Sequence, residues 1–285
     1  SDATKGWLPL EDDVTALEPV APPTQKAIFG YGYNASGGGR LSMSNLVNSS
    51  GVVAADVTGV GTARMTIAAT SYGGDKAIFG YGDSGSATNL SNLVSSSGVI
   101  ASDTTGVGTA RYAPAAASYD GDKGIFGYGD TGGDSYVSLT NLVNNSGVIA
   151  TDTTGVGTAR RYLAATGYGS SGQAVFAYGS TGSRLSMKNL VSNSGVVASD
   201  ATGVGSARNN LAAVKYGTDK AIFGYGSTGS ITGVTNLVSN VGVIASDVSG
   251  VGTARQYLAA ASYGGDKALF GYGNTASGAV SMTNL

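Results

Sequence analysis

The stretch that decides the fold is Lys-Ala-Ile-Phe-Gly-Tyr-Gly at residues 26–32, because close copies of it recur along the chain. The later copies begin at Lys76, Lys123, Gln173, Lys220 and Lys267, so successive copies stand 50, 47, 50, 47 and 47 residues apart. Self-similarity at a fixed period of this size indicates an array of like supersecondary units. The period predicts one domain built by repetition, which leaves little independent sequence for a single active site.

The composition of the 285-residue chain excludes several kinds of site. There is no Cys and no His, which removes disulfides, thiolate catalysis, His-based acid–base chemistry and the usual zinc sites. The formal net charge of −2 provides no electrostatic footprint for nucleic acid or an anionic membrane. No apolar stretch approaches the length of a membrane span. We therefore expect no metal, no cofactor, no nucleic-acid partner and no membrane insertion.

Each repeat contains four short segments separated by turn residues. The first two are exemplified by residues 257–263 and 267–273, the third by residues 137–143 and the fourth by residues 147–152. All are alternating or β-branched and bounded by Gly, Asn, Ser or Asp, which is the signature of strands in a meander. None has the length or the 3.6-residue period of a helix. The sequence therefore predicts an all-β fold of four-stranded antiparallel units.

The first segment of the repeat carries alanines that favour a β-propeller and place this segment innermost. Strands nearest a propeller axis are crowded by their symmetry mates and need small side chains. A linear β-solenoid is the alternative, but it explains neither the alanines nor the meander-like turns. The alanines stand at Ala68-Ala69, Ala115-Ala116-Ala117, Ala164-Ala165, Ala212-Ala213 and Ala259-Ala260-Ala261.

These residues carry a resemblance to a known family. The pattern at residues 64–82 resembles a kelch repeat. It consists of an Arg, then small residues, then Tyr-Gly-Gly-Asp and Lys-Ala-Ile-Phe-Gly-Tyr-Gly. Gly-Tyr-Gly stands where kelch has its diglycine, whereas Asn-Leu-Val replaces the usual Tyr-Asp and Val replaces the fourth-strand Trp. The amino-acid sequence from Asn45 to Arg64 is also similar to repeat proteins of tailed, especially aquatic, phages. The resemblance covers nearly the whole chain and implies a kelch-like propeller that is a virion structural protein.

The number of segments indicates how such a propeller would close. The second and third segments occur six times, but the first and fourth are complete in only five copies. Within residues 1–25, the segment 6–15 aligns with residues 51–58, and Trp7 falls where a kelch blade has its Trp. We expect six blades over residues 26–285, closed by the N-terminal strand, which removes exposed edges. The alternative is that this strand crosses to a neighbouring copy and links subunits.

Only the loop between the second and third segments varies appreciably in length. From the Tyr of Gly-Tyr-Gly to the Asn of the third segment there are 14, 11, 13, 11, 11 and 12 residues in successive copies. Binding residues concentrate in such loops above a rigid scaffold, although neutral drift in solvated loops would look the same. The candidate ligand-binding residues are Tyr33, Asn34, Arg40, Asp83, Asp130, Asp134, Tyr136 and Arg184.

An Asp and an Arg recur in every complete copy, always 8 residues apart. One interpretation is a set of sites for anionic or sugar ligands, since Arg binds carboxylates through two hydrogen bonds. The other is structural, with each Asp capping a turn in its own Asp-x-Thr/Ser-Gly segment and each Arg pairing between blades. Strict repetition favours the structural role, and the repeated Tyr of Gly-Tyr-Gly is expected to pack between neighbouring blades. The positions are Asp56, Arg64, Asp103, Arg111, Asp152, Arg160, Asp200, Arg208, Asp247 and Arg255.

The sequence predicts that the protein is not an enzyme. Its only Glu residues, Glu11 and Glu18, lie outside the repeats, and the Ser-x-Asp-x-Gly-x-x-Trp turn of sialidases is absent. Repeated single Asp residues do not form the pair of unlike carboxylates that glycoside hydrolysis needs. With the resemblance, we expect a phage virion structural protein that contacts other virion proteins or copies of itself. A glycan-binding adhesion module for a host surface is the main alternative, and an intracellular kelch-type adaptor is a third.

Overall fold

The computed structural model describes residues 26–34 and 38–285, and these residues form β-strands and no helix. The residues of the predicted closing segment, 1–25, lie outside them. The strands are β1 (Ala27–Asn34), β2 (Gly39–Val47), β3 (Ala68–Tyr72), β4 (Lys76–Gly80), β5 (Ser91–Val94), β6 (Ala115–Tyr119), β7 (Lys123–Asp130), β8 (Tyr136–Val143), β9 (Ala164–Tyr168), β10 (Gln173–Ala177), β11 (Lys188–Val191), β12 (Ala212–Tyr216), β13 (Lys220–Gly224), β14 (Thr235–Val238), β15 (Ala259–Tyr263), β16 (Lys267–Gly271), β17 (Asn274–Thr275), β18 (Gly278–Ala279) and β19 (Thr283–Asn284).

The strands form small antiparallel sheets, each within one repeat. In the described part of the chain the sheets are β1-β2, β3-β4-β5, β6-β7-β8, β9-β10-β11, β12-β13-β14 and β15-β16-β19, with the short hairpin β17-β18 beside them. The second strand of a repeat lies in the middle, so that Phe79 is opposite Ala69 on one side and Asn92 on the other. The all-β fold and the meander order of the first three segments are confirmed.

The fourth segment of the repeat differs from the prediction. In the described residues it is not a regular strand but meets the third strand at two isolated bridges, such as Val94↔Ile100 and Ser91↔Thr104. Between these bridges the side-chain amide of Asn92 donates to the carbonyl of Ala101 at 3.0 Å. A side chain thus takes the place of a ladder hydrogen bond, which the alternation of apolar residues did not reveal.

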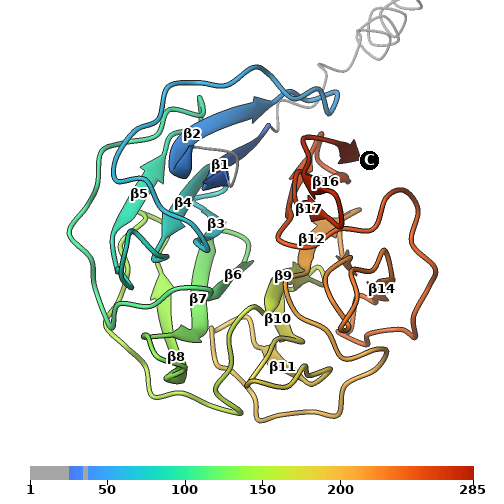
Figure 1. Cartoon of the computed structure of the whole chain (residues 1–285). Helices are drawn as coiled ribbons and strands as arrows, with labels where there is room; N and C mark the ends of the chain where they lie inside the picture. The colour runs from blue at the N-terminus through green and yellow to red at the C-terminus, as the bar shows by residue number, and fades with distance from the viewer. Residues whose placement is uncertain (1–25, 35–37) are drawn as a thin grey trace, which may run out of the picture.

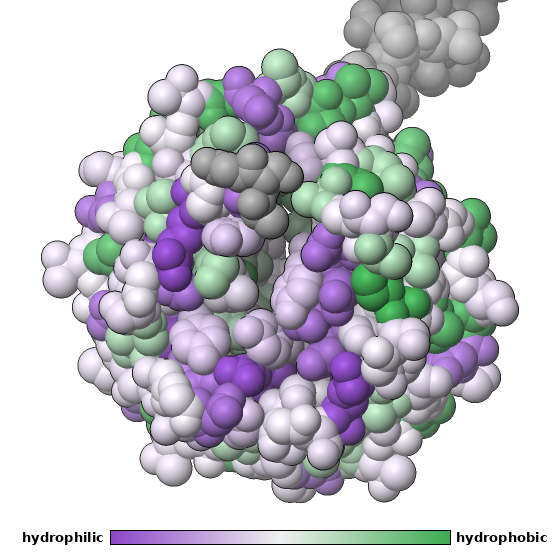
Figure 2. Space-filling view, in the orientation of Figure 1, coloured by the Kyte–Doolittle hydropathy of each residue, from purple (hydrophilic) through white to green (hydrophobic). Residues whose placement is uncertain are grey.

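The alanine-rich first strands lie innermost, as predicted. Figure 1 shows the sheets one after another around a common centre, with β3, β6, β9 and β12 toward that centre and β5, β8, β11 and β14 away from it. Each first strand packs against the first strand of the next repeat, from β3 to β15, and β15 also packs against β1. Small side chains permit this close approach. One face of the molecule has a hollow near its middle, with hydrophilic side chains beside it (Figure 2).

Aromatic pairs join each sheet to the next. The Tyr of Gly-Tyr-Gly meets the Phe of the following repeat edge-on, with ring centroids 5.2–5.3 Å apart, a favoured geometry for aromatic rings. The expected role of this Tyr in packing between repeats is confirmed. The pairs are Tyr31–Phe79, Tyr81–Phe126, Tyr128–Phe176, Tyr178–Phe223, Tyr225–Phe270 and Tyr272–Phe29. The last of these joins the final sheet to the first.

The variable loop length has a simple structural meaning. In the two repeats with the longest loops the second and third strands continue past a bulge as a hairpin, as in Tyr33↔Arg40 and Asp130↔Tyr136. In the repeats with the shortest loops the chain turns back at once through a single bridge, such as Asp83↔Ala87. The length differences therefore extend or shorten one hairpin without moving the sheets.

Candidate functional site

The repeated arginines are fully buried within the described structure. The Arg160 guanidinium donates to the carbonyls of Tyr178 at 2.8 Å and Thr158 at 3.0 Å, and to Asn189 Oδ1 at 2.8 Å. Its centre also lies 4.3 Å from the ring centroid of Tyr128, which belongs to the preceding repeat. One side chain thus ties two sheets together through hydrogen bonds and a cation–π contact. The equivalent residues, each with 0 % exposure, are Arg64, Arg111, Arg208 and Arg255.

Four of the five repeated Asp residues hold a turn, but in the neighbouring repeat and not in their own segment. Asp152 accepts hydrogen bonds from the Thr109 hydroxyl at 2.6 Å and from the Thr109 backbone N–H at 3.0 Å. It also accepts from Asn141 Nδ2 at 2.9 Å. Asp103, Asp200 and Asp247 bind a Thr or Ser of the preceding repeat in the same way. These hydrogen bonds favour the structural interpretation, although the turn that is capped is not the one expected from the Asp-x-Thr/Ser-Gly segment.

Asp56 shows the same contact from one side only. Its carboxylate accepts from Asn45 Nδ2 at 2.8 Å, as the other copies do from their Asn. No Thr or Ser of the described residues donates to Asp56. Residues 1–25, which precede its repeat in the chain, lie outside the described residues. By analogy with the other copies, a hydrogen-bond donor for Asp56 would have to come from residues outside the described ranges.

Hydrogen bonding lowers the pKa of the Asp103, Asp152, Asp200 and Asp247 carboxyls. Partial burial raises the pKa of Asp152, but donors from Thr109 and Asn141 and the charge of Arg111 outweigh burial, so this pKa lies below its ordinary value. The pKa values of Asp103, Asp200 and Asp247 are lowered by equivalent groups, again against the effect of burial.

We expect this lowering to make the protein acid-sensitive. A carboxyl with a lowered folded-state pKa adds stability that is fully present above the ordinary aspartate pKa of about 4 and is lost as the pH falls through the lowered value. Thermal melting should therefore show a falling melting temperature below about pH 4. Asp152→Asn should lower the melting temperature at neutral pH and weaken its pH dependence. Asp75→Asn, on an exposed turn, is the control, and an equal effect of both variants would contradict the assignment.

The residues predicted from the variable loops fall into separate groups. Arg40 Nη2 contacts Asp83 Oδ1 at 3.0 Å and joins the first two repeats, which accounts for both residues structurally. Tyr33 is 57 % exposed at the end of β1, and Asn34 follows it in the same strand. Besides this pair, Asp130, Asp134 and Tyr136 come together in one place.

That place is a cluster of charged and aromatic side chains around Arg161. Asp130 is fully buried and accepts from Arg161 Nη1 at 2.6 Å and from the Tyr112 hydroxyl at 3.0 Å. Arg161 Nη2 reaches Asp134 at 2.8 Å, and the Tyr136 hydroxyl donates to Asp134 at 3.1 Å. The guanidinium also lies 5.3 Å from the Tyr136 ring centroid. Within the described residues such a cluster forms at one junction between two repeats, whereas the repeated Asp and Arg recur along the chain, and it is therefore the best candidate for a function specific to this protein.

Sequence reasoning missed Tyr112, Arg161 and Tyr162 because it searched for variation in length. The two residues after each repeated Arg never change their spacing, yet they differ in every copy. They read Met65-Thr66, Tyr112-Ala113, Arg161-Tyr162, Asn209-Asn210 and Gln256-Tyr257. Variation of side chain at a fixed position was the signal that could have found them.

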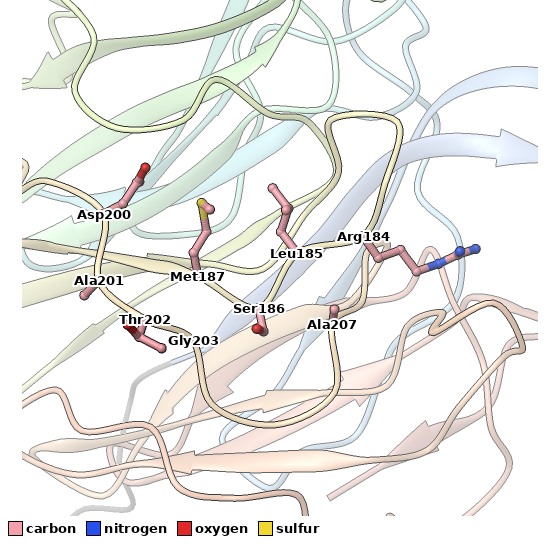
Figure 3. Close-up of a pocket in the computed structure, with 9 residues that line it drawn as sticks. All are labelled: Arg184, Leu185, Ser186, Met187, Asp200, Ala201, Thr202, Gly203 and Ala207. Atoms are coloured by element: carbon pink, nitrogen blue, oxygen red, sulfur yellow. The ribbon is translucent and has the colours of Figure 1, made fainter.

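Arg184 lies at a different place, in the wall of an open depression of about 430 Å³ that is lined by residues 184–187, 200–203 and 207. In Figure 3 its guanidinium extends away from the other lining side chains. Asp200, on the opposite side of the depression, already accepts from Thr158 and Asn189. Asp200 is thus already hydrogen-bonded and the Arg184 guanidinium points away from the depression, which leaves the Arg161 cluster as the stronger candidate.

Three further observations complete the description. The described residues contain no group of three or more acidic side chains that could hold a metal ion. No helix long and apolar enough to cross a membrane occurs in residues 26–34 and 38–285. No family model and no curated protein matches the chain.

Proposed function

We propose that the chain is a six-bladed, kelch-like β-propeller whose ring is closed by its N-terminal strand. The Tyr272–Phe29 pair supports this arrangement, since its 5.2 Å centroid distance equals that of pairs between consecutive repeats. The contact of β15 with β1 supports it as well. Residues 26–285 form the propeller in this proposal.

The last sheet supports the role of residues 1–25 as the closing segment. Thr253 stands where Thr109 and Thr158 donate to an Asp of the following repeat, and Asn284 stands where Asn141 does. In the earlier repeats Nδ2 of this Asn donates to the repeated Asp, as Asn141 Nδ2 does to Asp152 at 2.9 Å. In the alignment of residues 6–15 with residues 51–58, Asp13 takes the position of the repeated Asp. It would supply the missing acceptor for Thr253, either in its own ring or in that of a neighbouring copy.

In this proposal the protein is a non-enzymatic structural component of a tailed-phage virion, in its capsid, tail or fibre. The observation that carries it is the fully buried arginine between successive repeats, which makes a rigid scaffold and leaves the repeated polar residues occupied. Asp103, Asp152, Asp200 and Asp247 each bind a neighbouring turn, so these equivalent carboxylates do not offer the pair of free, unlike carboxylates of a hydrolase. The assignment to a phage particle rests on the resemblance of the repeat sequence to repeat proteins of tailed phages.

Mass spectrometry of purified virions tests the structural role. We expect peptides of this chain in particles that have been separated from lysate by density gradient, at a constant ratio to the major capsid protein. A non-structural phage protein in the same infected culture serves as the control for contamination. Detection in the infected-cell lysate but never in washed particles would refute the proposal.

A second candidate function is glycan binding for attachment to a host surface. The specific observation that favours it is the Arg161 cluster, which breaks the regularity of the repeat with partly exposed aromatic and charged side chains. Binding to an array of host envelope glycans tests it, and silence across neutral and acidic sugars would count against it.

A further inference from the structure

The residues two positions after each repeated Arg form a continuous rim. Backbone hydrogen bonds join them in succession: Ala113 N donates to Thr66 O at 2.9 Å, Tyr162 N to Ala113 O at 3.2 Å, Asn210 N to Tyr162 O and Tyr257 N to Asn210 O, both at 3.0 Å. Each of them has a φ of 49–55°. We call these five residues the inner rim, because each stands two residues before an innermost strand. Their backbone geometry is the same, so only the side chains distinguish one position from another.

Two tyrosines meet on the inner rim although they belong to repeats that are not consecutive. The ring centroids of Tyr162 and Tyr257 lie 6.1 Å apart at 81°, and Asn210 stands between them along the rim. Tyr257 is 53 % exposed, which is unusual for a ring held by an aromatic neighbour. Asn210 Oδ1, by contrast, is buried and has no hydrogen-bond partner. A buried acceptor without a donor is costly, and such groups call for an explanation such as a function.

The Arg161 cluster supports this pair from the side. The Arg161 guanidinium lies 5.0 Å from the Tyr162 ring centroid, and Asp130 and Asp134 hold it by ion pairs. One cation therefore faces two carboxylates, so the cluster offers no unpaired positive charge to an acidic ligand. The arrangement fixes Tyr162 and leaves the ring of Tyr257 accessible to solvent.

We propose that Tyr162, Asn210 and Tyr257 form a subsite for one neutral sugar residue of a glycan. The apolar C–H face of a pyranose packs against an exposed aromatic ring, and rotation of the Asn210 side chain would present its buried carbonyl to a sugar hydroxyl, the donor that it lacks. Phenolic hydroxyls and amides bind sugar hydroxyls without a net charge. Acidic sugars are disfavoured, because the carboxylates outnumber the single guanidinium beside the site. This inference rests on the second proposed function and is independent of the place of the protein in a virion.

The chain offers variants that keep the backbone intact. Ala113 occupies the equivalent rim position with a φ of 52°, against 55° at Tyr257 and Tyr162, so alanine is compatible with this conformation. Tyr257→Ala and Tyr162→Ala should therefore fold. Tyr33→Ala is the matched control, since Tyr33 is as exposed as Tyr257, at 57 %, but has no ring neighbour among the aromatic contacts of the described residues.

The test is NMR titration of the full chain with the methyl glycosides of glucose, galactose, mannose and N-acetylglucosamine, and with sialic acid as the acidic probe. We expect at least one neutral glycoside to bind with a millimolar dissociation constant. Tyr257→Ala should weaken that binding by about tenfold, the size of one lost aromatic contact, while Tyr33→Ala leaves it unchanged.

The outcomes separate the site from the function. No binding of any sugar would overturn both the subsite and the glycan candidate. Neutral-sugar binding that survives Tyr257→Ala and Tyr162→Ala, or that Tyr33→Ala abolishes, would overturn the subsite alone and place binding in the variable loops. Preferential binding of sialic acid would contradict the charge argument. None of these results bears on whether the protein is found in particles.

Discussion

Replacing Arg160 by alanine is expected to lower the free energy of unfolding by about 3–5 kcal/mol, the usual cost of removing one member of a buried charged network. The side chain is fully buried and donates to two carbonyls and to Asn189 Oδ1, at 2.8–3.0 Å. Without it these three acceptors lose their donor in the interior, and the ring of Tyr128 loses the guanidinium that covers it. Because the contact joins two sheets, unfolding should also lose cooperativity.

Urea denaturation followed by circular dichroism measures this effect. Arg184→Ala is the control, since Arg184 is partly exposed and makes only a long contact of 3.4 Å to Ser227. We expect a change below about 1 kcal/mol for this variant, as for most surface positions. Arg160→Lys should recover little, because an ammonium lacks the planar fork that reaches all three acceptors. Equal stability of Arg160→Ala and Arg184→Ala would show that the buried arginines do not hold the sheets together.

Deleting residues 1–20 is expected to make the protein aggregate or melt at a much lower temperature. The deletion removes Trp7 and Asp13, the residues that we place in the sixth blade. Loss of a buried Trp side chain alone costs about 3 kcal/mol or more, a large share of the net stability of a domain. It would also leave the edge of the last sheet open to other chains.

A shorter deletion of residues 1–5, which precede the aligned segment, is the control and should leave melting unchanged. A peptide of residues 1–20 added in trans should partly rescue the long deletion. If the long deletion stays monomeric with an unaltered melting temperature, ring closure by this segment is wrong. If the intact protein forms concentration-dependent chains that the peptide terminates, the strand is exchanged between subunits.

The sequence predicted the elements that follow from repetition and side-chain size. The copies of Lys-Ala-Ile-Phe-Gly-Tyr-Gly identified the second strands, and the alanines placed β3 and its equivalents innermost. The fixed spacing of Asp and Arg indicated a structural role, which the full burial of the Arg side chains and the hydrogen bonds of both residues favour. These features follow from the order and spacing of residues within each repeat, which can be read from a single sequence.

The features that the sequence did not reveal are contacts between residues that are far apart along the chain. The capping of Thr109 by Asp152 joins residues 43 positions apart, and no local pattern distinguishes it from a cap within the segment. Asn92 replaces a ladder bond of the fourth segment with its side chain, which alternation of apolar residues cannot show. Tyr162 and Tyr257 belong to copies that are not consecutive, so only the arrangement of the sheets brings them together.

The aromatic pairs between sheets have a consequence for how the chain acquires its order. Every neighbouring couple of sheets meets through the same Tyr and Phe at nearly the same distance, from Tyr31–Phe79 to Tyr225–Phe270. These aromatic pairs do not tell a correct neighbour from an incorrect one, and only a few junctions add a specific contact such as Arg40–Asp83 or Arg161–Asp130. The order of assembly is therefore set by the shortness of the connections between consecutive repeats and not by recognition. Chains that fold close together compete for one another's sheets, and dilution or slow synthesis favours the correct partner.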